Sequence, residues 1–308
     1  MASIAKFTDS ACNNELRHNN RLIVHDKNTD IDPERTKQNY SLTPYISIPK
    51  SDYYKKRGDI RKQEYDHYQQ RKKELYCYNR SDVKTMAGCI VTLPKEISAA
   101  AEQADFFKSV TDFLSERYGS PNVVSVTIHY DEGRLVTQKL SGGNTVETFL
   151  VGQPHLHFNW IPACRIDHAA LSAKSHHCTG MDHYNEKISA NDVINKKDLQ
   201  TLHKDLQKYL KDHGVSGQVL LKKVGEGKSL NLTVSQLKEL SDRTGSVIDQ
   251  SLSIEKLADI LNENRDLEIR NKELETQIAS LARDHERNNT WGNQTAWGNT
   301  IENGEKIW

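Results

Sequence analysis

The sequence has no long run of apolar residues, and this absence excludes an integral membrane protein. A membrane-spanning helix needs about 20 consecutive apolar residues, whereas 27% of the 308 residues here are charged and the mean hydropathy is -0.75. Residues 1–9 also lack the extended apolar segment of a secretory signal. We therefore expect a cytoplasmic protein without membrane insertion.

Cysteine is scarce as well. The five cysteines are odd in number, are scattered along the chain and form no Cys-x-x-Cys pair. Such usage favours free thiols in a reducing compartment over a disulfide framework. The cysteines and histidines of 164–183 do cluster, but their spacing matches no standard zinc module. A second zinc site is therefore the weaker interpretation of that segment.

The formal net charge is zero, which argues against nucleic-acid binding over the whole surface. Residues 50–73 nevertheless hold nine Lys and Arg against four Asp and Glu, and eight of the twelve tyrosines lie within 40–78. Basic groups neutralise phosphates, and aromatic rings stack on unpaired bases. A solvated helix over 59–76 is the alternative, but we predict a segment that faces DNA. The expected contacts are Lys55, Lys56, Arg57, Arg61 and Lys62.

The pattern of apolar residues predicts an α+β domain with a largely antiparallel sheet. Residues 22–45 have many turn formers and little periodicity, which indicates an ordered loop. The expected elements are strands at 87–93 and 123–130, a hairpin at 134–151 with its turn at 141–144, a strand around 155–160, and helices at 98–118 and 197–212.

The C-terminal part follows a different pattern. From Leu257 to Leu281 the seam residues alternate at spacings of three and four, with Asn264 and Asn271 at a positions. Paired asparagines fix the register of a parallel two-stranded coiled coil, so we expect a dimer through 257–281 rather than a helix packed on the domain. The expected organisation is a main domain at 1–214, a linker with a short helix at 215–250, a coiled-coil helix at 251–287 and a disordered tail at 288–308.

Three histidines indicate a metal site. His155 and His157 are two residues apart on an apolar strand, so their side chains share one face of it. The strand at 123–130 places His129 near its end, and the three imidazoles converge if the two strands are neighbours. Three neutral nitrogens with open coordination positions describe a catalytic metal site. The alternative is that one or two of them are ordinary core or surface histidines.

Two more motifs lie near the N-terminus: His-Asn-Asn-Arg at 18–21, and an Asp-Ile-Asp string at 30–32 that leads through Arg-Thr to Asn-Tyr at 39–40. They are followed by His-x-Asp-Glu at 129–132 and Pro-His-Leu-His-Phe at 154–158. In this order the motifs resemble those of the MobV-type relaxases, the Pre/Mob plasmid mobilisation and recombination enzymes. The likeness covers roughly residues 6–214.

The resemblance implies a fold like that of the HUH endonucleases, in which an antiparallel sheet flanked by helices carries the metal-binding histidines. It implies a divalent cation, Mn²⁺ or Mg²⁺, on residues matching His129, His155 and His157, with Glu132 beside the metal. It also implies a bacterial enzyme that nicks one strand of DNA at the origin of transfer of a mobile element and rejoins or transfers that strand.

The resemblance further implies roles for residues of the N-terminal motifs. His18 matches the proposed nucleophile, which forms a covalent phosphohistidine with the 5′ end of the cut strand. Arg21 is expected to clamp the phosphate, and Glu132 to orient His18 or to move a proton. Tyr40, the older candidate for covalent attachment, fits better as a DNA contact, as does Arg35.

One departure from the family pattern is an insertion at 133–152 between the last two motifs, where a hairpin would leave the flanking strands paired. Two rival functions remain open: a rolling-circle replication initiator of the same superfamily and a non-nucleolytic metal-dependent hydrolase. The expected partners are origin DNA, a second copy of the chain and a conjugative coupling protein.

Overall fold

The computed structural model describes residues 2–23, 30–139, 145–169, 179–219, 236, 239–241 and 254–297. It divides into two compact units, Met1–Lys223 and Val224–Trp308. The expected linker helix near 234–240 and the expected hairpin turn at 141–144 fall largely or wholly outside the described residues. Among the described helices, none is long and apolar enough to cross a bilayer.

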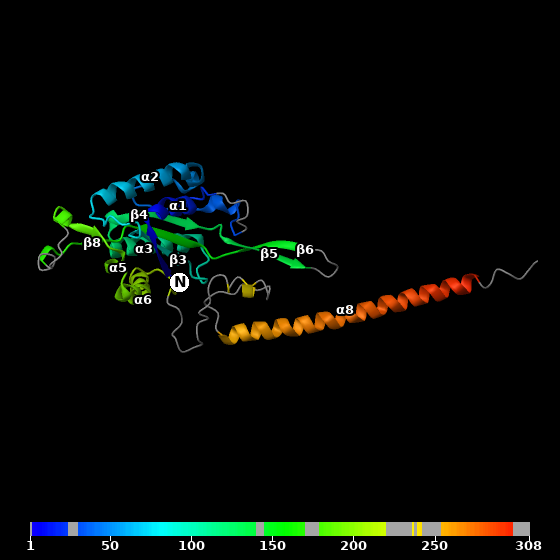
Figure 1. The fold of residues 1–308 in the computed structure, drawn as a ribbon. Helices are drawn as coiled ribbons and strands as arrows, with labels where there is room; N and C mark the ends of the chain where they lie inside the picture. Colours follow the sequence, from blue (N-terminus) through cyan, green and yellow to red (C-terminus); the bar gives the residue numbers. More distant parts are fainter. Residues whose placement is uncertain are drawn as a thin grey trace, which may run out of the picture. The chain divides into compact units, whose positions relative to one another are not determined.

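The first unit is built on a five-stranded antiparallel sheet (Figure 1) with the order β1-β3-β7-β4-β2. Its strands are β1 (Ala2–Thr8), β2 (Tyr40–Ser41), β3 (Lys84–Thr92), β4 (Val123–His129) and β7 (His155–Trp160). The central strands β3, β4 and β7 lie close to the expected bounds, so their prediction is confirmed. The first strand, β1, has no counterpart among the expected elements.

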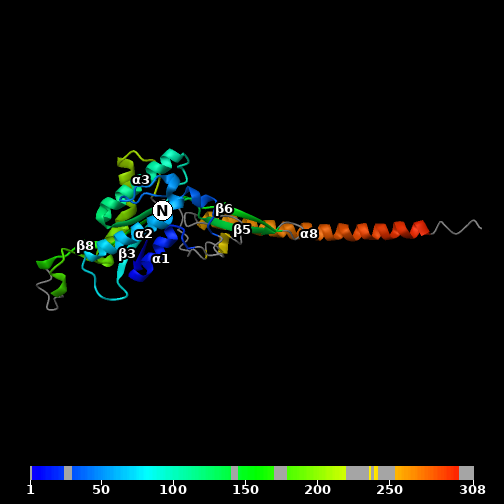
Figure 2. The ribbon, with the colours of Figure 1, turned by 90° about the horizontal axis from the view of Figure 1, so that it is seen from above.

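Helices cover both faces of this sheet (Figures 1 and 2). On one side lie α1 (Asp9–Asn19) and α2 (Tyr53–Lys73), and on the other α3 (Ala100–Tyr118) and α6 (Lys196–Asp212). The expected helices at 98–118 and 197–212 are α3 and α6, and that prediction is confirmed. Helix α3 ends at Gly119, whose φ of 88° suits a residue without a Cβ atom.

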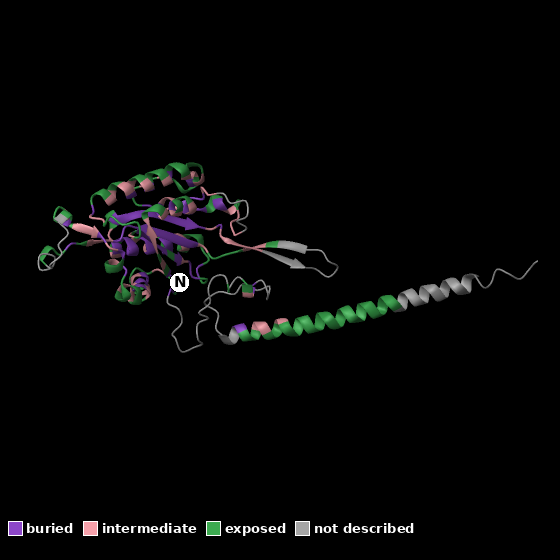
Figure 3. Ribbon diagram, viewed as in Figure 1, coloured by how far each residue is buried: buried purple, intermediate pink, exposed green. Residues whose placement is uncertain are grey.

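Side chains alternate along β7, so that one face of this strand is apolar and the other carries the two histidines. Leu156, Phe158 and Trp160 are fully buried in the core shared with α3 and α6, and the Trp160 ring stacks on Tyr118 with centroids 4.2 Å apart. His155 and His157 alternate with them and therefore point to the α1 side. The buried colour of the central strands in Figure 3 reflects the helices on both faces.

Shorter elements complete the first unit. The expected hairpin is present as β5 (Gly133–Lys139) and β6 (Thr145–Val151), paired from Gly133 with Val151 to Lys139 with Thr145. At its root a Cβ on Gly133 would lie 2.4 Å from the Leu150 carbonyl oxygen, so only glycine fits there. The remaining elements are the strand pair β8 (Ala163–Arg165) and β9 (Glu186–Ile188), α5 (Ala190–Val193), and 3-10 turns at Arg35–Gln38, Lys50–Asp52, Ser120–Asn122 and Thr179–Met181.

The first unit extends past the expected boundary at residue 214. Val219 is buried in the main core, and Val215 packs against that core. The Gln207 side chain on α6 donates to the Gly217 carbonyl at 3.1 Å and accepts from the Val219 amide at 2.8 Å. The segment after Gly214 therefore belongs to the main domain, which corrects the expected start of the linker.

The second unit contains one long helix, α8 (Ile254–Trp297). The helix covers the predicted coiled-coil segment and continues beyond residue 287, where a disordered tail was expected to begin. Its described side chains are mostly exposed (Figure 3), including Leu267 at 53%, Leu274 at 48% and Ile278 at 64%. The apolar seam residues from Leu267 to Leu281 are thus solvent-facing in a single chain, whereas Leu257 is buried.

A chain that ends at residue 214 should be less stable than one that ends at residue 223. Removing the buried Val219 side chain forfeits about 1.5–3 kcal/mol of burial free energy, and the Gln207 amide loses both backbone partners. Urea unfolding followed by circular dichroism should show a lower midpoint for the shorter chain. Equal midpoints would mean that residues 215–223 contribute nothing to the domain.

Candidate metal centre

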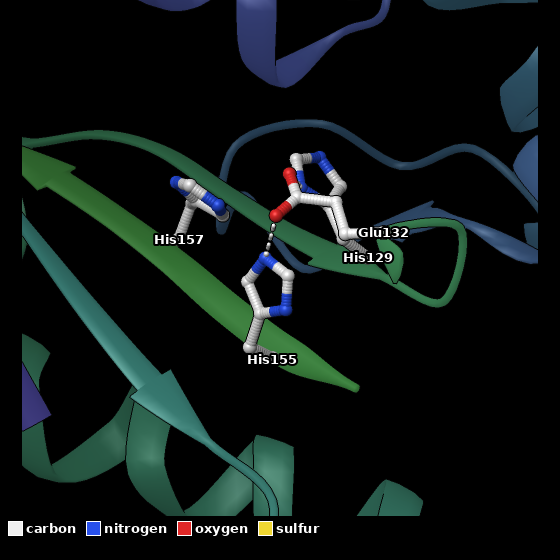
Figure 4. A group of neighbouring side chains, drawn as sticks. All are labelled: His129, Glu132, His155 and His157. Carbon is white, nitrogen blue, oxygen red and sulfur yellow. Dashed lines mark ion pairs between the residues drawn. The ribbon is translucent and has the colours of Figure 1, made fainter. Parts of the chain in front are cut away.

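Register between β4 and β7 brings the predicted histidines together. His129 is paired with His155, and Thr127 with His157, so all three imidazoles lie on the α1 face of neighbouring strands. Glu132, just after β4, joins them (Figure 4), and one ligand atom from each of the four residues lies within 4.8 Å of the others. The three-histidine cluster expected from the sequence is present.

Hydrogen bonds fix which ring nitrogens face the centre. The His129 Nε2 donates to the Asn19 carbonyl oxygen at 2.7 Å, which leaves its Nδ1 as the acceptor. The His155 Nδ1 faces the Gln153 carbonyl oxygen at 3.1 Å and donates to it, so its Nε2 carries the lone pair. The His155 Nε2 atom lies 3.3 Å from the Glu132 Oε2 atom. A bound cation would offset the repulsion between the nitrogen lone pair and the carboxylate.

His157 supplies the clearest sign of a missing partner. Its Nε2 atom is buried and has no hydrogen-bond partner among the described residues. Burial lowers the pKa of His157 well below its ordinary value, and burial with the nearby Arg21 charge lowers the pKa of His129 to about 4. Neutral nitrogens and one carboxylate are a donor set that suits a divalent transition-metal ion such as Mn²⁺.

Glu132 is a carboxylate in this environment. Burial alone would raise its pKa, but its contacts with His129 and His155 outweigh burial and hold the pKa far below its ordinary value. Its Oε1 atom also accepts from the Arg21 Nη2 at 2.7 Å. Among the described residues no hydrogen bond or ion pair joins Glu132 to His18, and the Glu132 carboxylate lies with the three histidines.

Arg21 is held by a buried ion pair. Its Nε and Nη2 atoms donate to the two Asp131 oxygens at 2.9 and 2.8 Å, and Nη2 is also 2.9 Å from the His129 Nδ1. Asp131 is fully buried and receives a further hydrogen bond from the Thr36 hydroxyl at 2.9 Å. The guanidinium thus has acceptors within the protein, and the expectation that Arg21 clamps a phosphate stays a prediction.

Backbone strain accompanies this ion pair. Arg21 has a φ of 52°, the only positive φ outside glycine among the described residues. A left-handed conformation costs a residue with a Cβ atom roughly 1–2 kcal/mol, and it persists only where the surroundings over-determine it. The contacts with Asp131 and Glu132 supply that constraint on the side of the sheet.

His18 lies next to the cluster at the end of α1. Its ring is half-buried, with its centroid 6.3 Å from that of His157. Burial lowers the pKa of His18, and the Arg21 charge lowers it further, so the imidazole is neutral near pH 7. A neutral ring has a free lone pair, as a nucleophile requires.

The turn that carries His18 and Arg21 is also supported from α2. The Asn20 Nδ2 donates to the Glu64 Oε2 at 2.7 Å, and the Asn20 Oδ1 accepts from the Tyr53 hydroxyl at 3.3 Å. Glu64 is fully buried and accepts from the Thr43 hydroxyl at 3.1 Å. Burial raises the pKa of Glu64 to about 8.

Tyr40 lies apart from the cluster. It is paired with Ile128, so its side chain shares the α3 face and points away from the histidines. It is 4% exposed, stacks on Tyr130 and has the Lys50 ammonium 3.8 Å from its ring centroid. Tyr40 thus lies on the opposite face of the sheet from the histidine cluster, and the expected DNA contact stays a prediction. The Arg35 Nε donates to the Tyr130 carbonyl oxygen at 2.9 Å.

The predicted basic contacts all lie on α2 or at its start. Lys55 is exposed, while Lys56 pairs with Asp52, just before the helix, and Lys62 pairs with Asp66 on the helix. Arg57 lies over the Tyr54 ring, and Arg61 donates to the Asn13 side chain. Part of the positive charge of these side chains is therefore compensated by neighbouring acidic residues.

Residues 170–178 of the Cys/His segment lie outside the described part of the chain, so the weaker zinc interpretation stays untested.

Asp131, Asn20 and Glu64 are site residues that the sequence analysis missed. Asp131 stands inside the His-x-Asp-Glu motif, and a buried arginine in the first motif demands an acidic partner. The ion pair joins residues 21 and 131, which are far apart in the sequence, so no local pattern predicts it. Glu64 resembles any other charge on a polar helix, and only its burial sets it apart.

Known proteins resemble this chain in sequence and in fold. A sequence model of the family described as "Plasmid recombination enzyme" (Mob_Pre) matches residues 1–219. A plasmid recombination enzyme of Streptococcus agalactiae is 23% identical over 220 residues, covering 70% of this chain and 34% of that protein. The type 1 enzyme of Staphylococcus aureus is 26% identical over 224 residues, covering 68% and 48%. The chain thus spans less than half the length of these relatives.

A similar solved structure is the MobM relaxase domain, of the MOBV and Mob_Pre class, bound to oriT DNA of plasmid pMV158 and to Mn. The TM-score is 0.52 at 21% identity, over 78% of this chain and 97% of that chain. At this identity the likeness shows the fold, an antiparallel sheet with helices on its faces.

Replacing His157 with Ala should weaken Mn²⁺ binding by more than about 10-fold, because it removes a buried donor that has no other partner. Calorimetric titration with MnCl₂ measures the affinity, and circular dichroism checks the fold. Asn159→Ala is the matched control, since Asn159 lies two residues further along the same face of β7 and is outside the donor set. Equal affinity for the His157→Ala and wild-type proteins would reject the site.

Proposed function

Since this chain belongs to the plasmid recombination enzyme family, as the resemblance of its motifs implied, we propose that it is a relaxase. In this proposal it nicks one strand at the origin of transfer of a mobile element, holds the 5′ end covalently, and rejoins or transfers the strand. The observation that carries the proposal is the position of the His18 ring, whose centroid lies 6.3 Å from that of His157, beside a cluster of three histidines and Glu132. Origin DNA is the substrate and the main partner.

A divalent cation, Mn²⁺ or Mg²⁺, bound by His129, Glu132, His155 and His157 would supply Lewis-acid stabilisation for the charge that builds on the non-bridging phosphate oxygens. The protein's own part begins with His18. Its ring nitrogen attacks phosphorus, a P–N bond forms, and the P–O3′ bond breaks as the 3′ oxygen leaves and takes up a proton. Reversal of this step rejoins the strand without ATP, because the covalent link conserves the bond energy.

Arg21 and Asp131 act as positioning groups in this proposal. Their ion pair keeps the Arg21 guanidinium against the Glu132 oxygen, and it holds the backbone three residues after His18. The Arg21 backbone amide donates to the His18 carbonyl at 2.9 Å, which ties the nucleophile's own peptide to the turn. The nucleophile is therefore placed by a turn that the sheet anchors.

DNA binding is proposed for the exposed side of α2. Lys55 is the best-placed of the expected contacts, because Lys56 and Lys62 form ion pairs with nearby acidic residues. Exposed ion pairs such as those of Lys56 and Lys62 contribute little to stability, so DNA phosphates can replace the acidic partners. We therefore propose both lysines, with Arg57 and Arg61, as DNA contacts as well. Arg35 lies beside the site and is a further proposed DNA contact. A conjugative coupling protein is a further proposed partner.

A second copy of the chain is the proposed partner of α8. The seam from Leu257 to Leu281 repeats over about four heptads, and its residues Leu267 and Leu274 are exposed in a single chain. The two asparagines at a positions would pair across a parallel dimer and fix its register.

Two rival functions predict different products. A rolling-circle initiator of the same superfamily would also form a covalent link, yet it would act at a replication origin, and its typical pair of tyrosines is absent from the cluster described above. A non-nucleolytic metal-dependent hydrolase would leave DNA intact. Incubation of supercoiled origin DNA with Mn²⁺, with and without EDTA, separates these outcomes.

His18→Ala protein should bind origin DNA and form no covalent adduct, while Tyr40→Phe should keep at least partial nicking. The wild-type adduct should be labile to acid and to hydroxylamine, because a phosphoramidate at imidazole hydrolyses where a phosphotyrosine ester survives. Gel analysis of labelled origin oligonucleotides measures both. An acid-stable adduct mapped to Tyr40 by mass spectrometry would overturn the assignment.

Leu274→Lys should convert a dimer into a monomer in multi-angle light scattering, because it places a charge in the proposed seam. Ile269→Lys is the matched control: Ile269 is as exposed, at 49% against 48%, but lies off the seam. A wild-type chain that is already monomeric, or a Leu274→Lys chain that remains dimeric, would exclude this interface.

A further inference from the structure

We propose that Glu64 is a positioning residue for strand cleavage: through Asn20 it holds the turn that carries His18 and Arg21. This inference rests on the proposed relaxase function. It concerns a residue on α2 that belongs to none of the motifs and does not contact the metal donors.

The contact between Glu64 and Asn20 is short and fully enclosed. Both residues are 0% exposed, and the Asn20 Nδ2 lies 2.7 Å from the Glu64 Oε2. The second carboxyl oxygen of Glu64 accepts from the Thr43 hydroxyl, whose oxygen in turn accepts from the Val126 amide at 2.9 Å. Glu64 thereby links the turn to strand β4, which carries His129 at its end.

Asn20 is the residue through which this link acts. It caps α1, and its Nδ2 also donates to the Leu16 carbonyl at 3.0 Å. Its neighbours on either side are Asn19, whose carbonyl accepts from the His129 Nε2, and the strained Arg21. Displacement of Asn20 would therefore change the backbone on which His18, Arg21 and the orienting carbonyl of His129 depend.

Two clamps act on this turn from opposite sides. The ion pair with Asp131 holds the Arg21 side chain against the sheet, whereas Glu64 and Tyr53 hold the Asn20 side chain against α2. A buried carboxyl is a costly way to fill space between a helix and a sheet, and an apolar residue would pack there without that cost. The carboxyl is explained if its acceptor atoms are needed to fix Asn20.

The test compares cleavage of a single-stranded origin oligonucleotide by full-length variants over a range of DNA concentrations, with Mn²⁺ saturating. Glu64→Met keeps the volume and removes both acceptors, so kcat should fall by roughly 10–100-fold, as expected for a misplaced reacting group. KM and the Mn²⁺ affinity from calorimetry should change little. The Glu64 side chain is hydrogen-bonded to Asn20 and Thr43 and is not among the four residues of the metal cluster. Glu64→Gln keeps an acceptor for Asn20 and should restore most of kcat.

A double-mutant cycle shows whether Glu64 acts through Asn20. Asn20→Ala should lower kcat as Glu64→Met does, and the double variant should lose no more than the worse single variant. Tyr68→Phe is the structural control: Tyr68 lies one turn along α2, and its hydroxyl is bonded to Asp9 and Thr85, away from the turn. It should lower the melting temperature and leave kcat unchanged.

The outcomes are distinct. Losses that multiply in the double variant, wild-type kcat in Glu64→Met, or equal kcat losses in Glu64→Met and Tyr68→Phe would each overturn the positioning role. If Glu64→Met does not fold, Tyr53→Phe removes the other bond to Asn20 and should still lower kcat with KM unchanged. Absence of cleavage by the wild-type protein would instead reject the relaxase function itself.

Discussion

The buried guanidinium of Arg21 is the constraint on which the site depends. It joins an N-terminal turn to the end of β4 through Asp131 and Glu132, and it adopts a strained backbone conformation in doing so. Removing one partner of such a buried pair typically costs 3–5 kcal/mol, because the other charge is left without compensation. Arg21 thus belongs to the framework that joins the end of α1, and with it His18, to the end of β4.

The sheet makes this arrangement possible because its two faces are chemically separate. One face of β7 supplies Leu156, Phe158 and Trp160 to the core, and the other presents His155 and His157 under α1. Apolar packing on the α3 side keeps the strands in register. The metal donors can then be polar and close together without weakening the core, since a shift by one residue would bury them on the wrong side.

The sequence predicted the histidine cluster because the spacing of two along a strand is a local property, and the neighbouring strands and helices followed from equally local patterns. Roles that depend on distant contacts were not predictable in the same way. The burial of Glu64, the ion pair of Asp131 and the position of Tyr40 on the opposite face all arise from packing between segments far apart in the chain. Helix α1 was missed because it is largely polar, and strand β1 because its apolar residues Ala2, Ile4, Ala5 and Phe7 do not alternate regularly.

The hairpin of β5 and β6 leaves and re-enters the domain at one place. Gly133 is paired with Val151, and the Gly152 amide donates to the Glu132 carbonyl at 2.8 Å, so the two flanking strands meet as if nothing intervened. The interval between His129 and His155 in the sequence can therefore lengthen without moving the imidazoles apart. A search pattern that fixes this interval would overlook chains whose catalytic apparatus is complete, whereas one that lets it vary would recover them.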